Sequence, residues 1–128
     1  RRIQPSGAKL HIFERIESPQ ADLLPAAEAL NILPDCSVAM ITATTLINHS
    51  LDRLLEAARN CRKVIILGAS SPLCPEAFEE SCVNMVSGVL IPDPAPVLHI
   101  ISEGGGMHVF KRHVDKVNIR LKGEEKKS

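Results

Sequence analysis

The chain has very few aromatic residues: it contains no Trp, no Tyr and only three Phe among 128 residues. Proteins that hold single-stranded nucleic acid stack the bases on aromatic side chains, so this scarcity argues against that class of partner. The core must instead be aliphatic, as in parallel sheets that are buried on both faces. Hydrophobic residues make up 45% of the chain, which is enough for one domain with a packed interior.

The chain also lacks an excess of either charge and any long apolar run. Fifteen basic residues balance fifteen acidic ones, so there is no general attraction toward nucleic acids or anionic membranes. No apolar run approaches the ~20 residues of a membrane helix. The four cysteines are too widely spaced for a zinc ribbon or a disulfide scaffold. We therefore expect a cytoplasmic, reduced protein with no nucleic acid and no membrane partner.

What the sequence does contain is a repeated order of apolar strand, polar turn and helix. Residues 38–41 are apolar, residues 42–50 are rich in hydroxyls, and residues 51–58 carry apolar side chains at helical spacing. The same order recurs over residues 64–72, with a helix expected from about Leu73. The repeat predicts right-handed crossovers and a three-layer α/β sandwich with a mostly parallel sheet of about five strands.

The remaining elements fit one domain over residues 1–121 and a polar tail over residues 122–128. Arg1 to Gln4 would fit the end of a helix that follows a strand outside this sequence. Strands are expected at 9–14, 36–42, 83–91 (interrupted near Gly88) and 117–121, and a loop at 19–25. Helices are expected at 26–30, 47–58 and 107–114. A further helix should begin at Pro94, with an inward face of Val97, Leu98 and Ile101. The predicted core contains Leu10, Ile12, Val38, Met40, Ile41, Ile65, Leu67, Val89 and Leu90.

Polar side chains gather where the two best-defined strands end. Thr44, Thr45 and Asn48 follow one strand, and Ser70 and Ser71 follow the next. Ligands of open α/β sheets bind at this edge, where hydroxyls and free N–H groups can hold an anion or a polar ring. The simpler alternative is that these residues only cap helices or form turns. If the two strands are parallel neighbours in the sheet, both turns lie on one rim of the domain. An anionic group should bind at this rim before a cationic one.

A run of three glycines, Gly104, Gly105 and Gly106, interrupts the helix expected from Pro94. Consecutive glycines can form a backbone nest for an anion or act as a hinge. The alternative is a helix stop followed by a loop. We expect this loop to lie on or near the same rim as the two polar turns.

Metal ligands are harder to identify. His49, Cys74 and His108 each lie near a predicted turn and are the weak candidates, but their spacing matches no metal motif. The glycine pattern fits neither a phosphate-binding loop nor a dinucleotide fingerprint, and no nucleophile elbow is present. His49 is the best candidate for a general base, so whether the protein is an enzyme stays open.

Two ordered motifs resemble the putative heavy-metal chelation domain family. They are Thr42-Ala43-Thr44-Thr45-Leu46-Ile47-Asn48 and Gly68-Ala69-Ser70-Ser71-Pro72, followed by Asp93-Pro94 and Ser102-Glu103-Gly104-Gly105-Gly106. The resemblance implies a Rossmann-like C-terminal domain, which in the fuller family follows a smaller enolase-N-terminal-like domain, with the proposed site between the two. It also implies a heavy or transition metal ion as cofactor.

Three functions are consistent with these observations. The first is a domain that binds a small molecule, an anionic ligand or a metal complex at the carboxyl edge of the sheet. The second is a transferase or lyase that acts on a nucleotide-like or pterin-like substrate at the same edge. The third is a structural or oligomerisation module, whose partner would be an upstream domain or a second copy that docks beside residues 117–121.

Overall fold

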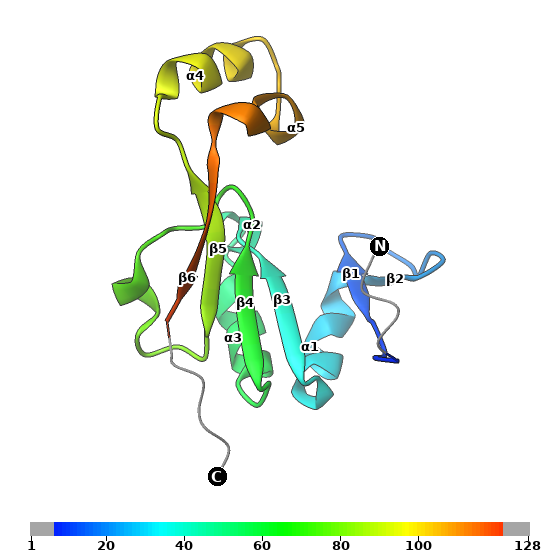
Figure 1. Ribbon diagram of the computed structural model, residues 1–128. Coiled ribbons are helices and arrows are strands. Elements are labelled where there is room, and N and C mark those ends of the chain that lie inside the picture. The colour runs from blue at the N-terminus through cyan, green and yellow to red at the C-terminus, as the bar shows by residue number, and fades with distance from the viewer. Residues whose placement is uncertain (1–6, 122–128) are drawn as a thin grey trace.

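The main sheet has four strands in sequential order, as a computed structural model of residues 7–121 shows (Figure 1). The strands are β3 (Val38–Thr42), β4 (Lys63–Leu67), β5 (Met85–Leu90) and β6 (Asp115–Arg120). β3, β4 and β5 run parallel, and β6 pairs with β5 antiparallel at one edge. The expected Rossmann-like α/β class with a mostly parallel sheet is therefore confirmed.

A second, two-stranded sheet precedes the main one. β1 (Ile12–Glu14) pairs in parallel with β2 (Leu23–Pro25), so the loop expected at residues 19–25 contains a strand. The short helices η2 (Ala26–Glu28), α1 (Ala29–Ile32) and η3 (Leu33–Asp35) then lead into β3. Helical structure after residue 25 was predicted. In this segment α1 packs against α3 (Leu51–Ala58), the second of the two helices that follow β3.

The helix predicted over residues 47–58 is divided into two. α2 (Thr44–Ile47) ends at Asn48, and α3 (Leu51–Ala58) begins after Ser50. The break lies at His49, whose φ of +58° cannot continue a right-handed helix.

The prediction of a helix from Leu73 is wrong, because only a 3₁₀ turn, η4 (Pro75–Phe78), forms there. Pro75 forces the residue before it, Cys74, into an extended conformation with φ −124° and ψ 92°. A longer helix therefore cannot begin before Pro75.

A small arm extends beyond the carboxyl end of β5 (Figure 1). It consists of α4 (Pro94–Ser102), α5 (Met107–Phe110) and η5 (Lys111–His113), and β6 leads back to the sheet. Asp93 caps α4, since its Oδ1 accepts a hydrogen bond from the Ala95 N–H at 3.1 Å. Val97 is buried, but the other two residues of the predicted inward face, Leu98 and Ile101, are exposed.

The core lies on one face of the sheet. Its buried side chains come from β3, β4, β5 and the connections between them: Ala39, Ile41, Val64, Ile66, Val86, Leu51, Ala58 and Phe78. Ile41 was correctly predicted as core, and Ile65, Leu67 and Val89 are half-buried. The other five predicted core residues are exposed: Leu10, Ile12, Val38, Met40 and Leu90.

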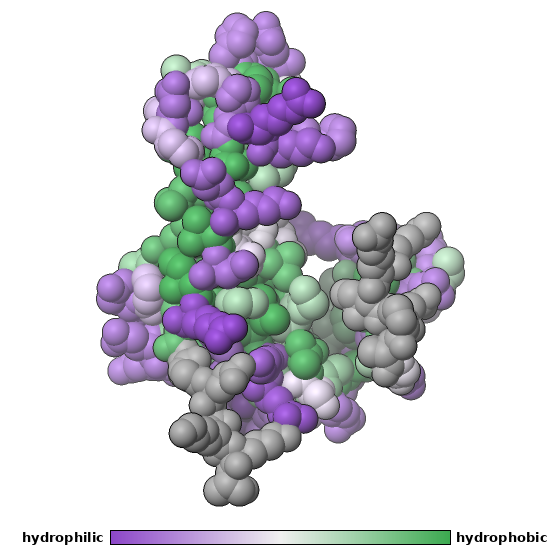
Figure 2. All heavy atoms as spheres, viewed as in Figure 1, coloured by the Kyte–Doolittle hydropathy of each residue, from purple (hydrophilic) through white to green (hydrophobic). Residues whose placement is uncertain are grey.

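The strand order explains why one face is bare. The connections from β3 to β4 and from β4 to β5 run in the same direction along the sheet. Right-handed crossovers that run in one direction cover the same face. Figure 1 shows α1, α2 and α3 behind the sheet, and Figure 2 shows hydrophobic atoms along the middle of the opposite face.

Three expectations bear on other parts of the chain. The helix end expected over Arg1 to Gln4 and the polar tail expected over residues 122–128 both lie outside the described residues. Within residues 7–121, no helix has the length and apolar character that crossing a bilayer requires.

Candidate functional site

The two polar turns lie side by side at the carboxyl edge of the sheet. Thr42 at the end of β3 is in register with Leu67 at the end of β4. The Ala43 N–H donates to the Leu67 carbonyl at 2.8 Å, and the Gly68 N–H donates to the Ser87 carbonyl of β5 at 3.1 Å. The expectation that both turns emerge on one rim is therefore confirmed.

Gly68 is the point at which the two turns meet. Its φ is +129°, a conformation that side chains other than glycine rarely adopt. A Cβ added there would lie 3.9 Å from Ala43 Cβ and from Thr42 Oγ1, so it would meet no steric clash. Glycine is therefore required by the backbone conformation of this turn.

The three threonines of the first turn divide into one inner residue, Thr45, and an outer pair, Thr42 and Thr44. Thr45 is buried, and its Oγ1 donates to the Thr42 carbonyl at 2.6 Å, so its hydroxyl stabilises the turn. The Thr44 and Thr42 hydroxyls lie 3.1 Å apart and are exposed on the rim. Of this turn, Thr42 and Thr44 are better placed than Thr45 to contact a ligand.

Ser71 is the unusual residue of the second turn. It is only 8% exposed, and its Oγ has no hydrogen-bond partner among the described residues. Leaving a buried hydroxyl unpaired costs roughly 1–3 kcal/mol. Ser70, its neighbour, is exposed. The rim thus contains one buried hydroxyl whose hydrogen bonding a polar ligand or a water molecule could complete.

Gly88 lets this turn pack against β5. A Cβ added to Gly88 would lie 2.9 Å from Leu73 Cδ2 and 3.2 Å from Ser71 Cβ. The predicted strand interruption at Gly88 is wrong, since β5 runs through it without a break. The sequence signal was the glycine itself, because a glycine inside a strand pattern often marks a close approach of another segment.

Asn48 and His49 lie at the break between α2 and α3. The Asn48 Oδ1 accepts hydrogen bonds from the Ser50 N–H at 3.1 Å and from the Ser50 hydroxyl. The Asn48 side chain therefore stabilises the local turn, but it does not cap α3, whose N-cap residue is Ser50 and which has no side-chain cap hydrogen bond. His49 is exposed and lies beside this turn, away from the core.

The prediction that an anionic group binds at this rim before a cationic one is not supported by helix dipoles. It required two helices whose N-termini point to a shared space. α2 has four residues, and the second turn is followed by the 3₁₀ turn η4 alone. A helix dipole builds up over several aligned turns, so neither element supplies a strong one. The rim therefore offers hydroxyls and backbone N–H groups.

The glycine run is a helix stop. Gly104 has a φ of +84°, and the Gly104 and Gly105 N–H groups each donate at 2.9 Å to α4 carbonyls, those of Ile101 and Ile100. A left-handed glycine that satisfies the last carbonyls is a common helix ending. Figure 1 shows the loop between α4 and α5, within the arm beyond the sheet. Two of the three glycine N–H groups are therefore hydrogen-bonded to carbonyls of α4.

The metal candidates do not converge. Within residues 7–121, no group of three or more His, Cys, Asp or Glu side chains is arranged to hold a metal ion. His49 and His108 are exposed, and the Cys74 thiol donates to Glu76 Oε2 at 3.3 Å. The pKa of Glu76 is lowered by a hydrogen bond from its own backbone N–H and by the Cys74 thiol.

The other cysteines lie at the amino edge of the sheet, opposite the two turns. Cys36, Cys61 and Cys82 each precede a parallel strand, and their thiols donate at 3.4 Å to backbone carbonyls. Burial raises the pKa of the Cys61 thiol, and the neighbouring Cys36 and Cys82 raise it further. Within residues 7–121 these thiols belong to no group of three or more donors arranged for a metal ion.

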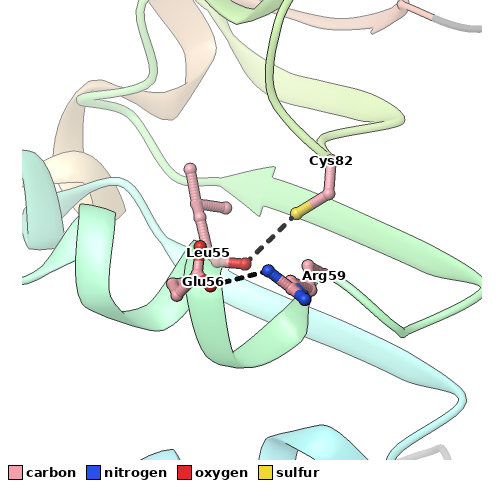
Figure 3. A network of polar contacts seen from close by, with 4 residues as sticks. All are labelled: Leu55, Glu56, Arg59 and Cys82. Carbon is pink, nitrogen blue, oxygen red and sulfur yellow. Dashed lines mark hydrogen bonds and ion pairs between the residues drawn. The ribbon is translucent and has the colours of Figure 1, made fainter.

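A groove of about 430 Å³ lies along α3, away from the two turns. Figure 3 shows two contacts in it: Arg59 pairs with Glu56 at 2.9 Å, and the Cys82 thiol donates to the Leu55 carbonyl. Both charged partners are largely exposed, so their ion pair contributes little to stability. Its acidic lining could have been anticipated from Asp52 and Glu56, which are four residues apart on one helix face.

Comparison with known proteins places the chain in a family. The family model described as "Putative heavy-metal chelation" (DUF364) matches residues 1–120. An uncharacterised protein of Methanocaldococcus jannaschii is 28% identical over 113 residues, which are 88% of this chain and 44% of that protein.

Two solved structures from the same family are also similar, and both are of proteins with unknown function. One, from Desulfitobacterium hafniense, is 30% identical with a TM-score of 0.76, over 86% of this chain and 43% of that one. The other, from Pyrococcus horikoshii, is 22% identical with a TM-score of 0.79, over 86% and 46%. The chain thus spans less than half the length of these relatives. It belongs to the family described as putative heavy-metal chelation.

Proposed function

We propose that this domain binds a small polar or anionic molecule, or a metal complex, at the rim formed by the turns 42–45 and 68–72. The observation that carries the proposal is the buried Ser71 hydroxyl, which has no partner among the described residues. Thr42, Thr44 and Ser70 add exposed hydroxyls on the same two turns. A hydroxyl both donates and accepts, so oxyanions and the edges of heterocycles are suitable ligands.

The family's description supports a heavy metal as part of the ligand. The residues of this chain do not fit a bare ion, because soft metals prefer thiolates and the described residues form no three-donor cluster. We therefore propose that a metal reaches the rim together with an organic or anionic partner, or that donors outside residues 7–121 hold most of its coordination sphere. Serine and threonine hydroxyls would then hold the partner.

The enzymatic alternative, a transferase or lyase, depends on His49. This side chain is exposed at the break between α2 and α3. Replacing His49 by Ala separates the two functions. A binding domain should keep its affinity within a few fold, whereas an enzyme that uses His49 as a general base should lose about 10²–10⁴-fold in turnover.

Calorimetric titration tests the proposed ligand class directly. The 128-residue chain would be titrated with molybdate, and separately with nickel, cobalt and zinc chlorides, each alone and then with molybdate present. We expect heat of binding from molybdate or from a metal with molybdate, and little from a metal alone. Tight binding of a bare metal that survives Ser71→Ala would contradict the proposal, because the chain's own donors would then suffice.

A further inference from the structure

Cys36 and Cys61 occupy matching positions on neighbouring segments. Each precedes one of two strands that pair in register, β3 and β4. The Ser37 carbonyl accepts hydrogen bonds from the N–H groups of Arg62 and Lys63, at 2.8 and 3.2 Å, so the two segments already lie side by side before the strands begin. The next residue back on each segment is a cysteine. Neighbouring strands lie ~4.8 Å apart, which is within the ~4.4–6.8 Å that separates the Cα atoms of a disulfide.

The two side chains also reach the same place. The Cys36 thiol donates to the Ile32 carbonyl and the Cys61 thiol donates to the Leu33 carbonyl, each at 3.4 Å. The Leu33 carbonyl accepts the Cys36 N–H as well, at 3.0 Å. One carbonyl oxygen thus contacts both residues, and the Cys61 sulfur lies against the backbone of Cys36. Rotation about the Cα–Cβ bonds is the movement that would bring the two sulfurs together.

Cys82 is the competing partner for Cys61. Its thiol donates at 3.4 Å to the Leu55 carbonyl of α3, as Figure 3 shows. When the register of β4 and β5 is followed back toward their amino ends, the residue opposite Cys82 is Arg62 rather than Cys61. Cys82 therefore differs from the other two cysteines both in strand position and in hydrogen-bond acceptor. All three thiols are half-buried, so a small oxidant can reach them.

We propose that Cys36 and Cys61 form a reversible disulfide when a peroxide oxidises the protein. The bond would close a loop that contains β3, the first polar turn, α2 and α3. Closing a loop lowers the entropy of the unfolded chain, so the oxidised protein should be the more stable form. The oxidation state of two thiols at the amino edge would then set the stability of the unit that carries Thr42 and Thr44 at the opposite edge.

The oxidation takes place in two steps, and burial decides their order. Burial, and after it the neighbouring Cys36 and Cys82, raise the pKa of the Cys61 thiol. Thiolates are the species that peroxides oxidise, so of this pair Cys36 is attacked first. Its sulfur takes one oxygen from hydrogen peroxide as the O–O bond breaks, and the released hydroxide leaves with the thiol proton as water. The Cys61 sulfur then forms the S–S bond and displaces that oxygen, which leaves with the Cys61 proton as a second water.

Mapping of the disulfide by mass spectrometry tests the proposed pairing. The folded 128-residue chain would be oxidised with hydrogen peroxide, its remaining thiols alkylated, and its peptides compared before and after reduction. We expect a monomeric product that has lost two hydrogens, with Cys36 joined to Cys61 and with Cys74 and Cys82 alkylated. The same reaction in urea is the control, because the unfolded chain should give a mixture of pairings.

Thermal denaturation gives a second readout. The oxidised chain should have a Tm at least ~5 °C above that of the reduced chain, and dithiothreitol should reverse the shift. Cys36→Ser should abolish both the disulfide and the Tm shift. Cys82→Ser is the matched control, which should keep both.

Four results would overturn the proposal. A bond from Cys61 to Cys82 would mean that the sulfurs meet between β4 and β5 instead. Bonds only between chains, or none, would mean that Cys36 and Cys61 do not approach. The same mixture of pairings from the folded and the unfolded chain would show that the fold does not select the pair. A bond between Cys36 and Cys61 that leaves the Tm unchanged or lowers it would show that the fold is not stabilised by closing this loop.

Discussion

Ala43 donates its backbone N–H to the carbonyl oxygen of Leu67 at 2.8 Å, one residue beyond the end of β3. This bond continues the β3–β4 pairing into the first turn and brings Ala43 against Gly68 in the second. The two polar turns are therefore held together by the backbone of the sheet. Side chains on this rim should accordingly be replaceable without loss of the fold, whereas replacement of Gly68 should be destabilising.

Gly68→Ala should lower the free energy of unfolding by roughly 1–3 kcal/mol. The φ of +129° is strained for alanine, while the nearest atoms at 3.9 Å leave space for the methyl group. Gly106→Ala is the control, because its φ is −108° and its added methyl also meets open space. Urea denaturation of both variants measures the difference, and equal losses would contradict the backbone explanation.

Gly88→Ala should be destabilising for a steric reason, by about 1–3 kcal/mol. Its methyl group would lie 2.9 Å from Leu73 Cδ2 and 3.2 Å from Ser71 Cβ, which pushes the second turn away from β5. Shortening Leu73 to Ala in the same chain should recover part of the loss. Thermal denaturation of the two single variants and the double variant gives the coupling, and strict additivity would show that the contact is unimportant.

Thr45→Val should cost about 1 kcal/mol, because it removes a buried hydroxyl and its 2.6 Å hydrogen bond to the Thr42 carbonyl. Thr44→Val is the matched control on the same turn. The Thr44 hydroxyl is exposed, so its loss should change stability by no more than ~0.5 kcal/mol. Equilibrium unfolding of the pair tests the division into inner and outer threonines, which a larger loss for Thr44→Val would reverse.

Cys61 should make the fold sensitive to alkaline pH. Burial, followed by Cys36 and Cys82, raises the pKa of the folded thiol above its ordinary value of 9.0. The unfolded chain then releases the proton first, so the stabilising contribution is complete below pH 9.0 and is lost as pH rises through the higher folded pKa. Urea unfolding from pH 7 to above pH 9.0 should show this decline, and Cys61→Ala should flatten it. An identical slope in the variant would exclude Cys61 as the cause.

The parallel strands and the shared rim could be predicted because their signals are local. The apolar runs and the polar turns that follow them each lie within about ten residues. Which face of the sheet packs against the core could not be predicted from such local signals. In the run Val38-Ala39-Met40-Ile41 every residue is apolar, so alternation gives no direction, and Ala39 faces the core while Met40 does not. Only the strand order decides which face is covered.

The details of the candidate site were missed for a similar reason. The break at His49 depends on a left-handed residue in a segment whose apolar spacing resembles one continuous helix. Burial of Ser71 depends on Gly88, which lies in another strand. In the sequence, the three glycines after α4 are consistent with an anion nest, a hinge or a helix stop, and only their hydrogen bonds to Ile100 and Ile101 identify a helix stop.

Replacement of Ser71 by alanine tests the central claim most directly, because the binding function and a purely structural role predict opposite results. The hydroxyl has no partner among the described residues, so Ser71→Ala should leave the free energy of unfolding unchanged or raise it. Affinity for molybdate, or for its metal complex, should fall about tenfold or more. Ser102→Ala is the control, since its hydroxyl donates to the His99 carbonyl on the distant arm. A Ser71→Ala protein that is less stable by more than ~1 kcal/mol but binds the probe as before would contradict the account.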